Sequence, residues 1–432
     1  MRKLNISIEI NGQQIPAGTI TWTDRQNAAF AYSEEYLKSE NGPISISLPL
    51  QEEPFTAGRT RNFFEGLLPE GFARKSVADW IHAPEDDYLT ILETLGEECL
   101  GAILVSAPND RAGVLEGTDP GGYEELSARE VKTLAREGIS KSTDLVVQAH
   151  LSLTGASGKV GLYYDENSDR WFLPKGTAPS THIVKQSHIR LGSIVTNEQL
   201  CMTTARALGM EVPDSFIIDL GQAEDEDILF ATKRYDRILT GDCRKTNGLP
   251  QPLRLHQEDF AQALGISAQQ KYEQPGQEYL RRMFNLIRAN CTDPITDQMK
   301  LWELLIFDFL IGNTDNHIKN ISLLYDTDMK RICMAPAYDI ISTCVYGESS
   351  RDMAVAIGGE LDIRQIGRKH FEVAAGEAGL GRQMAMRRFD ELADGFEDAL
   401  KASANELTEK GHAKADQICE KILQSGGYKE IL

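Results

Sequence analysis

The stretch NTDNHIKNISLLY, residues 313–325, gives the clearest indication of the fold and of the chemistry. Asp315 and Asn320 within it have the D-x-x-x-x-N spacing of a phosphotransferase catalytic loop. In such a loop the carboxylate orients the attacking hydroxyl and accepts its proton, while the amide oxygen ligates Mg²⁺. Composition alone predicts roughly one such pair in a chain of this length, so the spacing needs support from its surroundings.

The neighbours of this stretch favour a catalytic loop. The apolar run LWELLIFDFLI, residues 301–311, predicts a buried helix, and Gly312 is suited to end it. The letters ISLLYD that follow are typical of a strand. A histidine such as His317, between the two candidate residues, is more typical of a loop-ordering hydrogen bonder than of a metal ligand or a general base.

A second acidic candidate follows in APAYDIIST, where Asp339 is expected at the end of an apolar strand. Mg²⁺ takes few protein ligands and leaves its other positions to water and phosphate, so Asn320 and Asp339 would be a sufficient set. The alternative is that Asp339 caps the turn after the strand. The sequence by itself leaves both open.

Two features earlier in the chain are suited to bind phosphate. The first is SLTGASGKVGLYYD, residues 152–165, in which small residues precede an alternating strand, so that backbone N–H groups could approach phosphate oxygens. It is not a Walker A loop, because Leu153 stands where glycine is needed and Val160 where Ser or Thr would hold Mg²⁺. An ordinary β-turn is the alternative.

The second feature is Lys185 in THIVKQS, one strand later. Alternation places Ile183 and Lys185 on one face of this strand. Kinases carry a lysine on a strand after a glycine-rich hairpin, where it meets the α- and β-phosphates of the nucleotide. A solvated strand lysine is the alternative.

The first hundred residues are predicted to form a unit of their own. A hairpin is expected from LNISIEI through Asn11-Gly12 to IPAGTITW. A linker rich in Gly, Pro and acidic residues is expected near residues 108–125. Beyond it, Ser127 and Glu130 form a predicted capping box that opens a helix.

The order of the later elements indicates the fold class. Strands are predicted for SLTGASGKVGLYYD, RWFLPKG, THIVKQS, SFIIDLG and DILFATKRYDR, with one helix at residues 197–208 capped by Asn197. After His256 the pattern is helical, apart from the two strand-like segments ISLLYD and MAPAYDIIST. A β-rich part followed by a larger α-rich part is an α+β arrangement.

Composition and charge limit the function. The chain has 432 residues, a formal net charge of −20, and 41% hydrophobic and 25% charged residues. This excludes wholesale disorder, and the acidity argues against unaided binding to nucleic acid or to an anionic membrane. No signal peptide or membrane span is evident, and the seven cysteines lack a CxxC pair. We therefore expect a cytoplasmic protein without a membrane partner.

Together these motifs resemble the HipA-type serine/threonine kinases, the toxins of bacterial type II toxin–antitoxin pairs. FFEGLLPEGFAR and ETLGEECLGAIL are similar to the N-terminal subdomain of that family, and SLTGASGK, THIVKQ, FATKRYDR, LHQEDFAQALG, NTDNHIKN and APAYDIIST are similar to its kinase core, in family order. The resemblance implies a bilobal protein-kinase-like fold of the α+β class. Residues 1–110 would be the N-terminal subdomain, 111–250 the kinase N-lobe and 251–432 the helical C-lobe.

The resemblance also implies roles for single residues, with ATP and Mg²⁺ as cofactors. Asp315 would be the catalytic base, and Asn320 and Asp339 would hold Mg²⁺. Lys185 would contact the ATP phosphates, and residues 233–235 would be the hinge beside the adenine. The residues implied at ATP are Ser152, Gly155, Ala156, Ser157, Gly158, Lys159, Lys185, Lys233, Arg234, Tyr235, Gln257, His317 and Lys319.

Ser152 matches the serine on which the family autophosphorylates, a modification that ejects the loop and silences the enzyme. A phosphoserine adds about two negative charges and could not stay where ATP phosphates also sit. The loop departs from the family at one place, since members often carry Gln-Glu-Lys where this chain has Ser157-Gly158-Lys159. The geometry of inactivation is therefore left open.

The resemblance further implies partners: a HipB-like helix-turn-helix antitoxin, operator DNA contacted mainly through that antitoxin, and an aminoacyl-tRNA synthetase as the phosphorylated substrate. An acidic chain suits this division, because a basic antitoxin would make most of the phosphate contacts. Two alternatives stay open, namely a catalytically idle co-repressor subunit of a DNA-bound complex and a small-molecule phosphotransferase.

Overall fold

A computed structural model describes residues 1–108, 121–137, 159–187, 191–221, 225, 227–347 and 349–431. The chain forms two compact units. Unit 1 comprises Met1–Gln186, Ala231–Ala268 and Leu324–Arg331, and unit 2 comprises Ser187–Phe230, Gln269–Leu323 and Ile332–Leu432. The three domain ranges expected from the sequence stay predictions.

Unit 1 begins with an antiparallel sheet of order β3-β2-β1-β4. Its strands are β1 (Arg2–Ile10), β2 (Gln13–Trp22), β3 (Ala29–Tyr32) and β4 (Ile103–Ser106). The turn between β1 and β2 places Asn11 at φ 50° and Gly12 at φ 73°, the left-handed pair that a two-residue hairpin requires. The predicted hairpin is therefore confirmed.

Helices pack on this sheet through aromatic side chains. The helices are α1 (Glu34–Lys38), α2 (Ala57–Phe64), α3 (Gly71–Trp80) and α4 (Tyr88–Leu95), of which α1, α2 and α4 contact its strands. Phe30 of β3 lies against Phe64 of α2 and against Phe55, with ring centroids 5.3 Å and 6.0 Å away. All three rings are fully buried or nearly so, which makes them the centre of this core.

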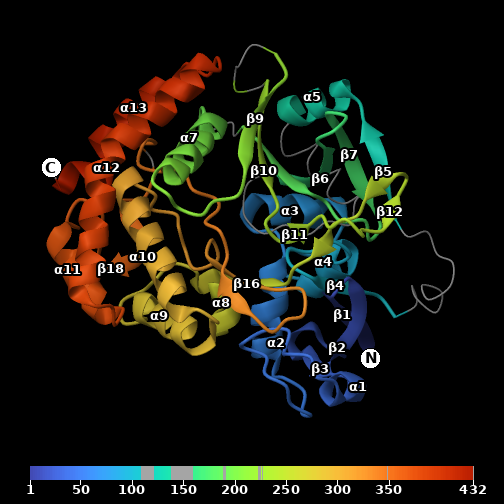
Figure 1. The fold of residues 1–432 in the computed structure, drawn as a ribbon. Helices are drawn as coiled ribbons and strands as arrows, with labels where there is room; N and C mark the ends of the chain where they lie inside the picture. The colour runs from blue at the N-terminus through green and yellow to red at the C-terminus, as the bar shows by residue number, and fades with distance from the viewer. Residues whose placement is uncertain are drawn as a thin grey trace. The chain divides into compact units, whose positions relative to one another are not determined.

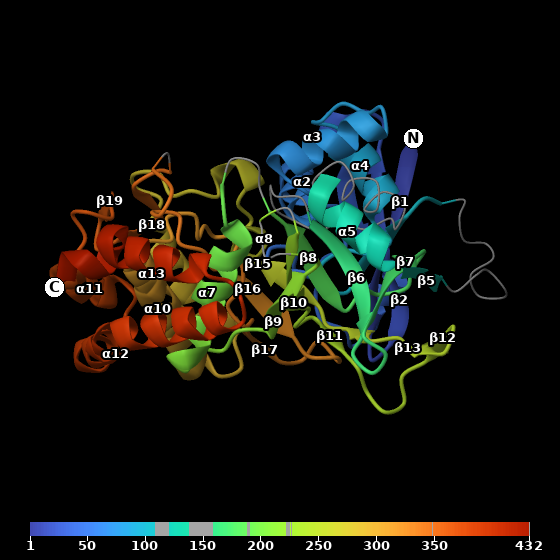
Figure 2. The same cartoon turned by 90° about the horizontal axis from the view of Figure 1, so that it is seen from above.

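A second sheet of unit 1 has the order β5-β7-β6-β8-β10. Its strands are β5 (Gly122–Leu126), β6 (Lys159–Asp165), β7 (Arg170–Lys175), β8 (His182–Gln186) and the last residues of β10 (Ile228–Lys233), and Figure 2 shows β6 and β7 side by side. The strands predicted here are confirmed. The predicted linker extends too far, because residues 122–125 pair with β7.

The helix after β5 begins as the sequence predicts. It is α5 (Ala128–Glu137), and the backbone N–H of Ser127 donates to Glu130 Oε2 at 2.8 Å while the N–H of Glu130 donates to Ser127 Oγ at 3.3 Å. The predicted capping box is therefore confirmed. The rest of unit 1 consists of β11 (Arg237–Ile238), β12 (Lys245–Thr246), β13 (Leu249–Pro250), β14 (Leu253–Arg254), β15 (Gln257–Asp259) and α8 (Phe260–Leu264).

Unit 2 is largely helical and has α10 (Pro294–Ile311) in its core, as the apolar run predicts. The other helices are α7 (Ile194–Ala207), α9 (Tyr279–Asn290), α11 (Arg368–Glu377), α12 (Arg382–Glu409) and α13 (Lys414–Ser425). The long helix α12 contacts α7, α10, α11 and α13 (Figure 1). Asp293 caps α10, and its side chain accepts from the N–H of Thr296.

The strands of unit 2 are short. They are β9 (Ser215–Asp219), which neighbours β10 in its sheet, β16 (Ser322–Tyr325), β17 (Ile332–Met334), β18 (Asp352–Ile357) and β19 (Glu360–Asp362). The first half of β16 belongs to this unit and confirms the strand predicted for ISLLYD. The expected strand through Asp339 is wrong, because β17 ends at Met334 and the chain beyond it is irregular.

The predicted cap of α7 is also wrong. The helix begins at Ile194, so Asn197 lies inside it and is fully buried. Its side chain donates to the Ser342 carbonyl at 2.8 Å and accepts from the Ser342 N–H at 3.2 Å. Asn197 therefore bonds to a distant segment and does not cap the helix, because a buried polar side chain needs hydrogen-bond partners.

Two further expectations concern membranes and thiols. In the ranges that the structure describes, no helix is both long enough and apolar enough to cross a membrane. All seven cysteines are free thiols.

Candidate active site

Gly312 turns the chain from α10 into the loop of residues 313–320. It adopts φ 73°, and its N–H donates to the Phe309 carbonyl at 3.1 Å. A Cβ at this position would lie 2.8 Å from Cβ of Cys344 and 3.0 Å from Cα of Gly426. Both the backbone conformation and the packing therefore require glycine here.

A buried carboxylate anchors the loop. Asp308 of α10 is 1% exposed and accepts hydrogen bonds from the side-chain amides of Asn313, at 2.9 Å, and of Asn316. Oδ1 of Asn313 in turn accepts from the N–H of Asp315 at 3.2 Å. Burial raises the pKa of Asp308 to about 7, although the two amide donors act in the opposite direction.

The two residues of the predicted catalytic motif lie in one turn. The carbonyl of Asp315 accepts from the N–H of His317 at 2.8 Å and from Nδ2 of Asn320 at 3.2 Å. Since the nitrogen of the Asn320 amide is turned to this carbonyl, its oxygen is directed elsewhere. The Asp315 side chain is exposed, and its carboxylate accepts a hydrogen bond from the hydroxyl of Tyr272.

Asp339 lies on the irregular segment after β17 at φ 58°. The preceding residue, Tyr338, donates to the Lys319 carbonyl at 3.2 Å, and its hydroxyl lies 2.7 Å from Ser322 Oγ. Asp339 and Asn320 therefore stand on segments that are hydrogen-bonded to each other. A non-glycine residue in the left-handed region costs energy, and such positions cluster at functional sites.

His317 and Lys319 are buried within unit 2, at 5% and 4% exposure. The His317 ring meets the Tyr272 ring edge to face, with centroids 5.2 Å apart. Contact with ATP stays a prediction for both residues.

Unit 1 places two of the predicted ATP-binding lysines opposite each other. Lys159 of β6 pairs directly with Lys185 of β8, while the next pair is Val160 with Val184. Directly paired residues of antiparallel strands point to one face of the sheet, so both lysines share a face. Like charges at this spacing repel, and they suit a polyanionic ligand such as a chain of phosphates.

Arg234, expected in the hinge, has its side chain in a buried ionic cluster instead. It pairs with Glu98 at 2.9 Å and with Asp236 at 2.7 Å, and Arg237 and Arg254 also pair with Glu98. Burial would raise the pKa of Glu98, but the three guanidinium groups more than offset this and lower it to about 2. Any nucleotide contact of Arg234 would therefore use its main chain.

The other hinge residues lie nearer the surface. Nζ of Lys233 pairs with Glu166 at 3.2 Å, and the Tyr235 hydroxyl donates to Oε1 of Gln257, which is 5% exposed. The predicted residues at the glycine-rich loop lie outside the described part of the chain; these are Ser152, Gly155, Ala156, Ser157 and Gly158.

The sequence interpretation missed two residues that the structure brings to this loop. Asp308 interrupts an apolar run, and an acidic residue inside a predicted buried helix could have drawn attention to it. Tyr272 contacts Asp315 although 43 positions separate them, and no local pattern marks it.

The donor set suits Mg²⁺ and ATP. Among the described residues no group of three or more His, Cys, Asp or Glu side chains could hold a metal ion. Mg²⁺ does not need such a group, because one or two protein oxygens together with phosphate and water complete its octahedron. In unit 2, the Asn320 amide oxygen and the Asp339 carboxylate are hard oxygen donors of this kind. Taken by itself, unit 1 offers Lys159 and Lys185, whose charges suit phosphate oxygens.

Family models match most of the chain. Residues 8–106 match the model described as HipA N-terminal domain, and residues 151–400 match the model described as HipA-like C-terminal domain. Y4mE of Sinorhizobium fredii, whose name proposes that it is a kinase, is 33% identical over 89% of this chain and 88% of its own length. The serine/threonine-protein kinase toxin HipA of Shewanella oneidensis is 27% identical over 82% of this chain and 78% of its own length.

Among solved structures, the Shewanella oneidensis complex of HipA with HipB and its operator DNA is similar to this chain. The TM-score is 0.78 at 22% identity, with 99% of this chain and 97% of the other covered. The likeness confirms the predicted α+β, protein-kinase-like fold.

Proposed function

Because the chain belongs to the HipA family, we propose that it is a Mg-ATP-dependent serine/threonine protein kinase that inhibits growth as the toxin of a toxin–antitoxin pair. The loop of residues 313–320 carries the proposal. In it the Asn320 amide nitrogen is bound to the Asp315 carbonyl, while the Asp315 carboxylate stays exposed. A carboxylate and an amide oxygen within one turn suit an acceptor hydroxyl and a metal ion, respectively.

Each residue then has a distinct task. Asp315 orients the acceptor hydroxyl and takes its proton as the hydroxyl oxygen attacks the γ-phosphorus. Lys159 and Lys185 bind phosphate oxygens. Asn320 and Asp339 would hold Mg²⁺, which neutralises charge on the phosphates when bound.

The nucleotide base and the regulatory serine complete the proposal. The main chain of residues 233–235 contacts the adenine, and Gln257 lies near the nucleotide edge. His317 and Lys319 are buried side chains of the catalytic loop itself and lie close to ATP. Ser152 is the autophosphorylated residue, whose modification switches the kinase off because its charge competes with the ATP phosphates.

We propose a HipB-like helix-turn-helix antitoxin as partner, operator DNA bound mainly through it, and an aminoacyl-tRNA synthetase as substrate in the cytoplasm. The Shewanella oneidensis relative was solved with HipB and its operator DNA, which supports the first two. The net charge of −20 supports DNA contact through a basic partner, since an acidic chain alone is repelled by phosphates.

Transfer of labelled phosphate from ATP tests the kinase. The purified chain with Mg²⁺ should incorporate label on Ser152, and Asp315→Ala should not. Asp394→Ala, which removes an exposed carboxylate of α12, is the matched control and should label like the parent. If the parent incorporates no label, the proposed activity is wrong.

Expression in cells tests the toxin and its substrate. The parent should arrest growth, and Asp339→Asn should not, because asparagine tolerates the left-handed backbone but lacks the charge needed for Mg²⁺. Phosphoproteomics after brief induction, with Asp315→Ala for comparison, should show a synthetase peptide that gains phosphate. If no synthetase peptide changes, the substrate assignment fails while the kinase activity stands.

A further inference from the structure

Tyr272 contacts the candidate catalytic loop at two places. Its hydroxyl donates a hydrogen bond to Oδ1 of Asp315, and its ring meets the His317 ring edge to face at 5.2 Å. The residue is 41% exposed, so it lies at the surface of unit 2. Tyr272 therefore binds the carboxylate through its hydroxyl while its ring packs on the same loop.

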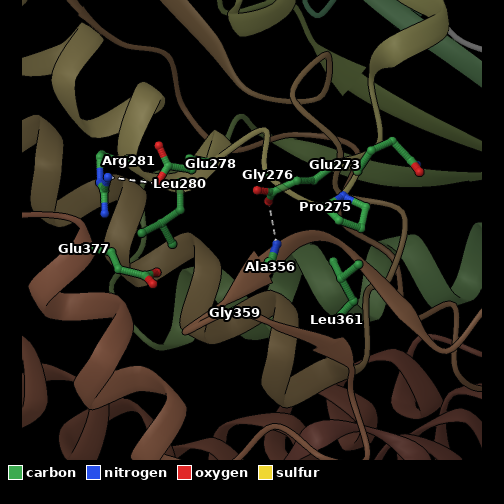
Figure 3. A pocket seen from close by; sticks show the side chains of 11 residues that line it. Glu273, Pro275, Gly276, Glu278, Leu280, Arg281, Ala356, Gly359, Leu361 and Glu377 are labelled. Atoms are coloured by element: carbon green, nitrogen blue, oxygen red, sulfur yellow. Dashed lines mark hydrogen bonds and ion pairs between the residues drawn. The ribbon is translucent and has the colours of Figure 1, made fainter.

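The backbone beside Tyr272 is firmly held. Oε2 of the next residue, Glu273, accepts from the Ala356 N–H of β18 at 2.8 Å, and Oε1 accepts from the Tyr279 N–H at 3.0 Å. The N–H of Glu273 donates to the Ala354 carbonyl at 2.9 Å. Figure 3 shows Glu273 and Ala356 joined beside the pocket that this segment borders. The backbone next to Tyr272 is therefore tied to β18 and to the start of α9.

The terminal torsion of an aspartate side chain has a broad energy minimum, so hydrogen bonds to the carboxylate decide its orientation. A donor on Oδ1 restricts that torsion. General base catalysis needs such a restriction, since the accepting oxygen must lie within hydrogen-bonding reach of the proton that it takes.

We propose that Tyr272 is a positioning residue for phosphoryl transfer, whose hydroxyl fixes the Asp315 carboxylate so that its second oxygen faces the acceptor hydroxyl. This rests on the proposed kinase function. The competing role is a gate, in which the phenol fills the place of the acceptor and must leave first. The geometry favours positioning, because one hydrogen bond occupies only part of the accepting capacity of a carboxylate and the ring contact with His317 anchors the side chain.

Self-labelling of the purified chain with γ-labelled ATP and Mg²⁺ tests the role. Tyr272→Phe keeps the ring and removes only the donor, so the initial labelling rate at saturating ATP should fall about tenfold, with the ATP concentration for half-maximal rate and the thermal midpoint unchanged. The matched control is Tyr428→Phe, which removes a hydroxyl that donates to the Glu397 carboxylate at 3.0 Å, far along the chain from the loop. The control should keep the initial labelling rate of the parent.

A second measurement separates positioning from a general effect on the fold. Mg-ATP should raise the thermal midpoint of Tyr272→Phe as much as that of the parent, because the variant alters the acceptor side of the reaction and not nucleotide binding. A smaller rise, or an unchanged or faster labelling rate of Tyr272→Phe, overturns the positioning role. If the parent transfers no phosphate, the proposed function fails and the positioning role with it. An active parent with an unchanged Tyr272→Phe variant contradicts the positioning role only.

Discussion

Asp308 accepts a hydrogen bond from Asn313 at 2.9 Å, and this contact ties the candidate catalytic loop to the core of unit 2. Asn313 in turn holds the backbone of Asp315, because its side-chain oxygen accepts a hydrogen bond from the N–H of Asp315 at 3.2 Å. The buried helix α10 therefore determines where the backbone of the candidate base lies.

The ionisation of Asp308 should make stability depend on pH. Its pKa is raised from 3.8 to about 7 in the folded state, mainly by burial, so the folded chain keeps a proton that the unfolded chain releases. The free energy of unfolding should therefore fall as pH rises from about 4 to about 7, by up to about 4 kcal/mol. Asp308→Asn should lose this slope, whereas Asp394→Asn should keep it in urea unfolding at about pH 5 and pH 8. An equal slope in the parent and Asp308→Asn would contradict the assignment.

Glu98 should be indispensable to unit 1. Glu98→Gln leaves three buried guanidinium groups without their shared carboxylate, which should cost about 3–5 kcal/mol in urea unfolding at neutral pH. The control Glu93→Gln removes the exposed pair with Arg2 and should cost less than about 1 kcal/mol. Equal losses of unfolding free energy in the two variants would show that the buried cluster contributes no more to stability than an exposed ion pair.

The same cluster should weaken the fold in acid. The pKa of Glu98 falls from 4.5 to about 2 on folding, so its contribution is present above about pH 4.5 and is lost as pH falls toward 2. The parent should therefore lose stability between about pH 4.5 and pH 3 more steeply than Glu98→Gln. Identical acid profiles would rule this group out as the cause.

Gly312 should tolerate alanine less well than Gly209. Both lie just after helices at positive φ, 73° and 81°, so alanine should cost about 1–2 kcal/mol at either from the backbone alone. Only Gly312 also has Cys344 within 2.8 Å of the new Cβ, which should add about 1–3 kcal/mol and displace the loop. Gly312→Ala should therefore also lower kcat, while Gly209→Ala should not. Equal thermal midpoints and rates for the two would contradict the packing argument.

Lys185 should contribute to ATP affinity. Lys185→Met removes one of two cations on one face of the sheet, so the affinity for Mg-ATP should drop about 10–100-fold. The rise in thermal midpoint that Mg-ATP causes in the parent should shrink accordingly. Lys175→Met, which breaks an ion pair with Glu124 on the same sheet, should respond like the parent. A full Mg-ATP response in Lys185→Met would remove this lysine from the nucleotide site.

Local patterns predicted the elements well where neighbouring residues settle the conformation. The Asn11-Gly12 turn depends on two residues that tolerate positive φ, and the box of Ser127 and Glu130 closes within one turn of helix. The prediction failed at Asn197, where a cap-like residue found a distant partner in Ser342 instead. Burial of a polar group outweighs the local preference, because leaving it unsatisfied costs more than losing a cap.

The sequence by itself determined the D-x-x-x-x-N spacing of Asp315 and Asn320, the glycine that ends the helix before them, and the strand of Lys185, since each depends on residues close in the chain. Only the tertiary structure decided that Asp308 anchors the loop and that the Arg234 side chain forms an ion pair with Glu98. It also decided that Tyr272 donates a hydrogen bond to Asp315, 43 positions away in the chain. Such partners are selected by burial and by the need to satisfy charges and hydrogen bonds inside a packed core, which no local pattern records.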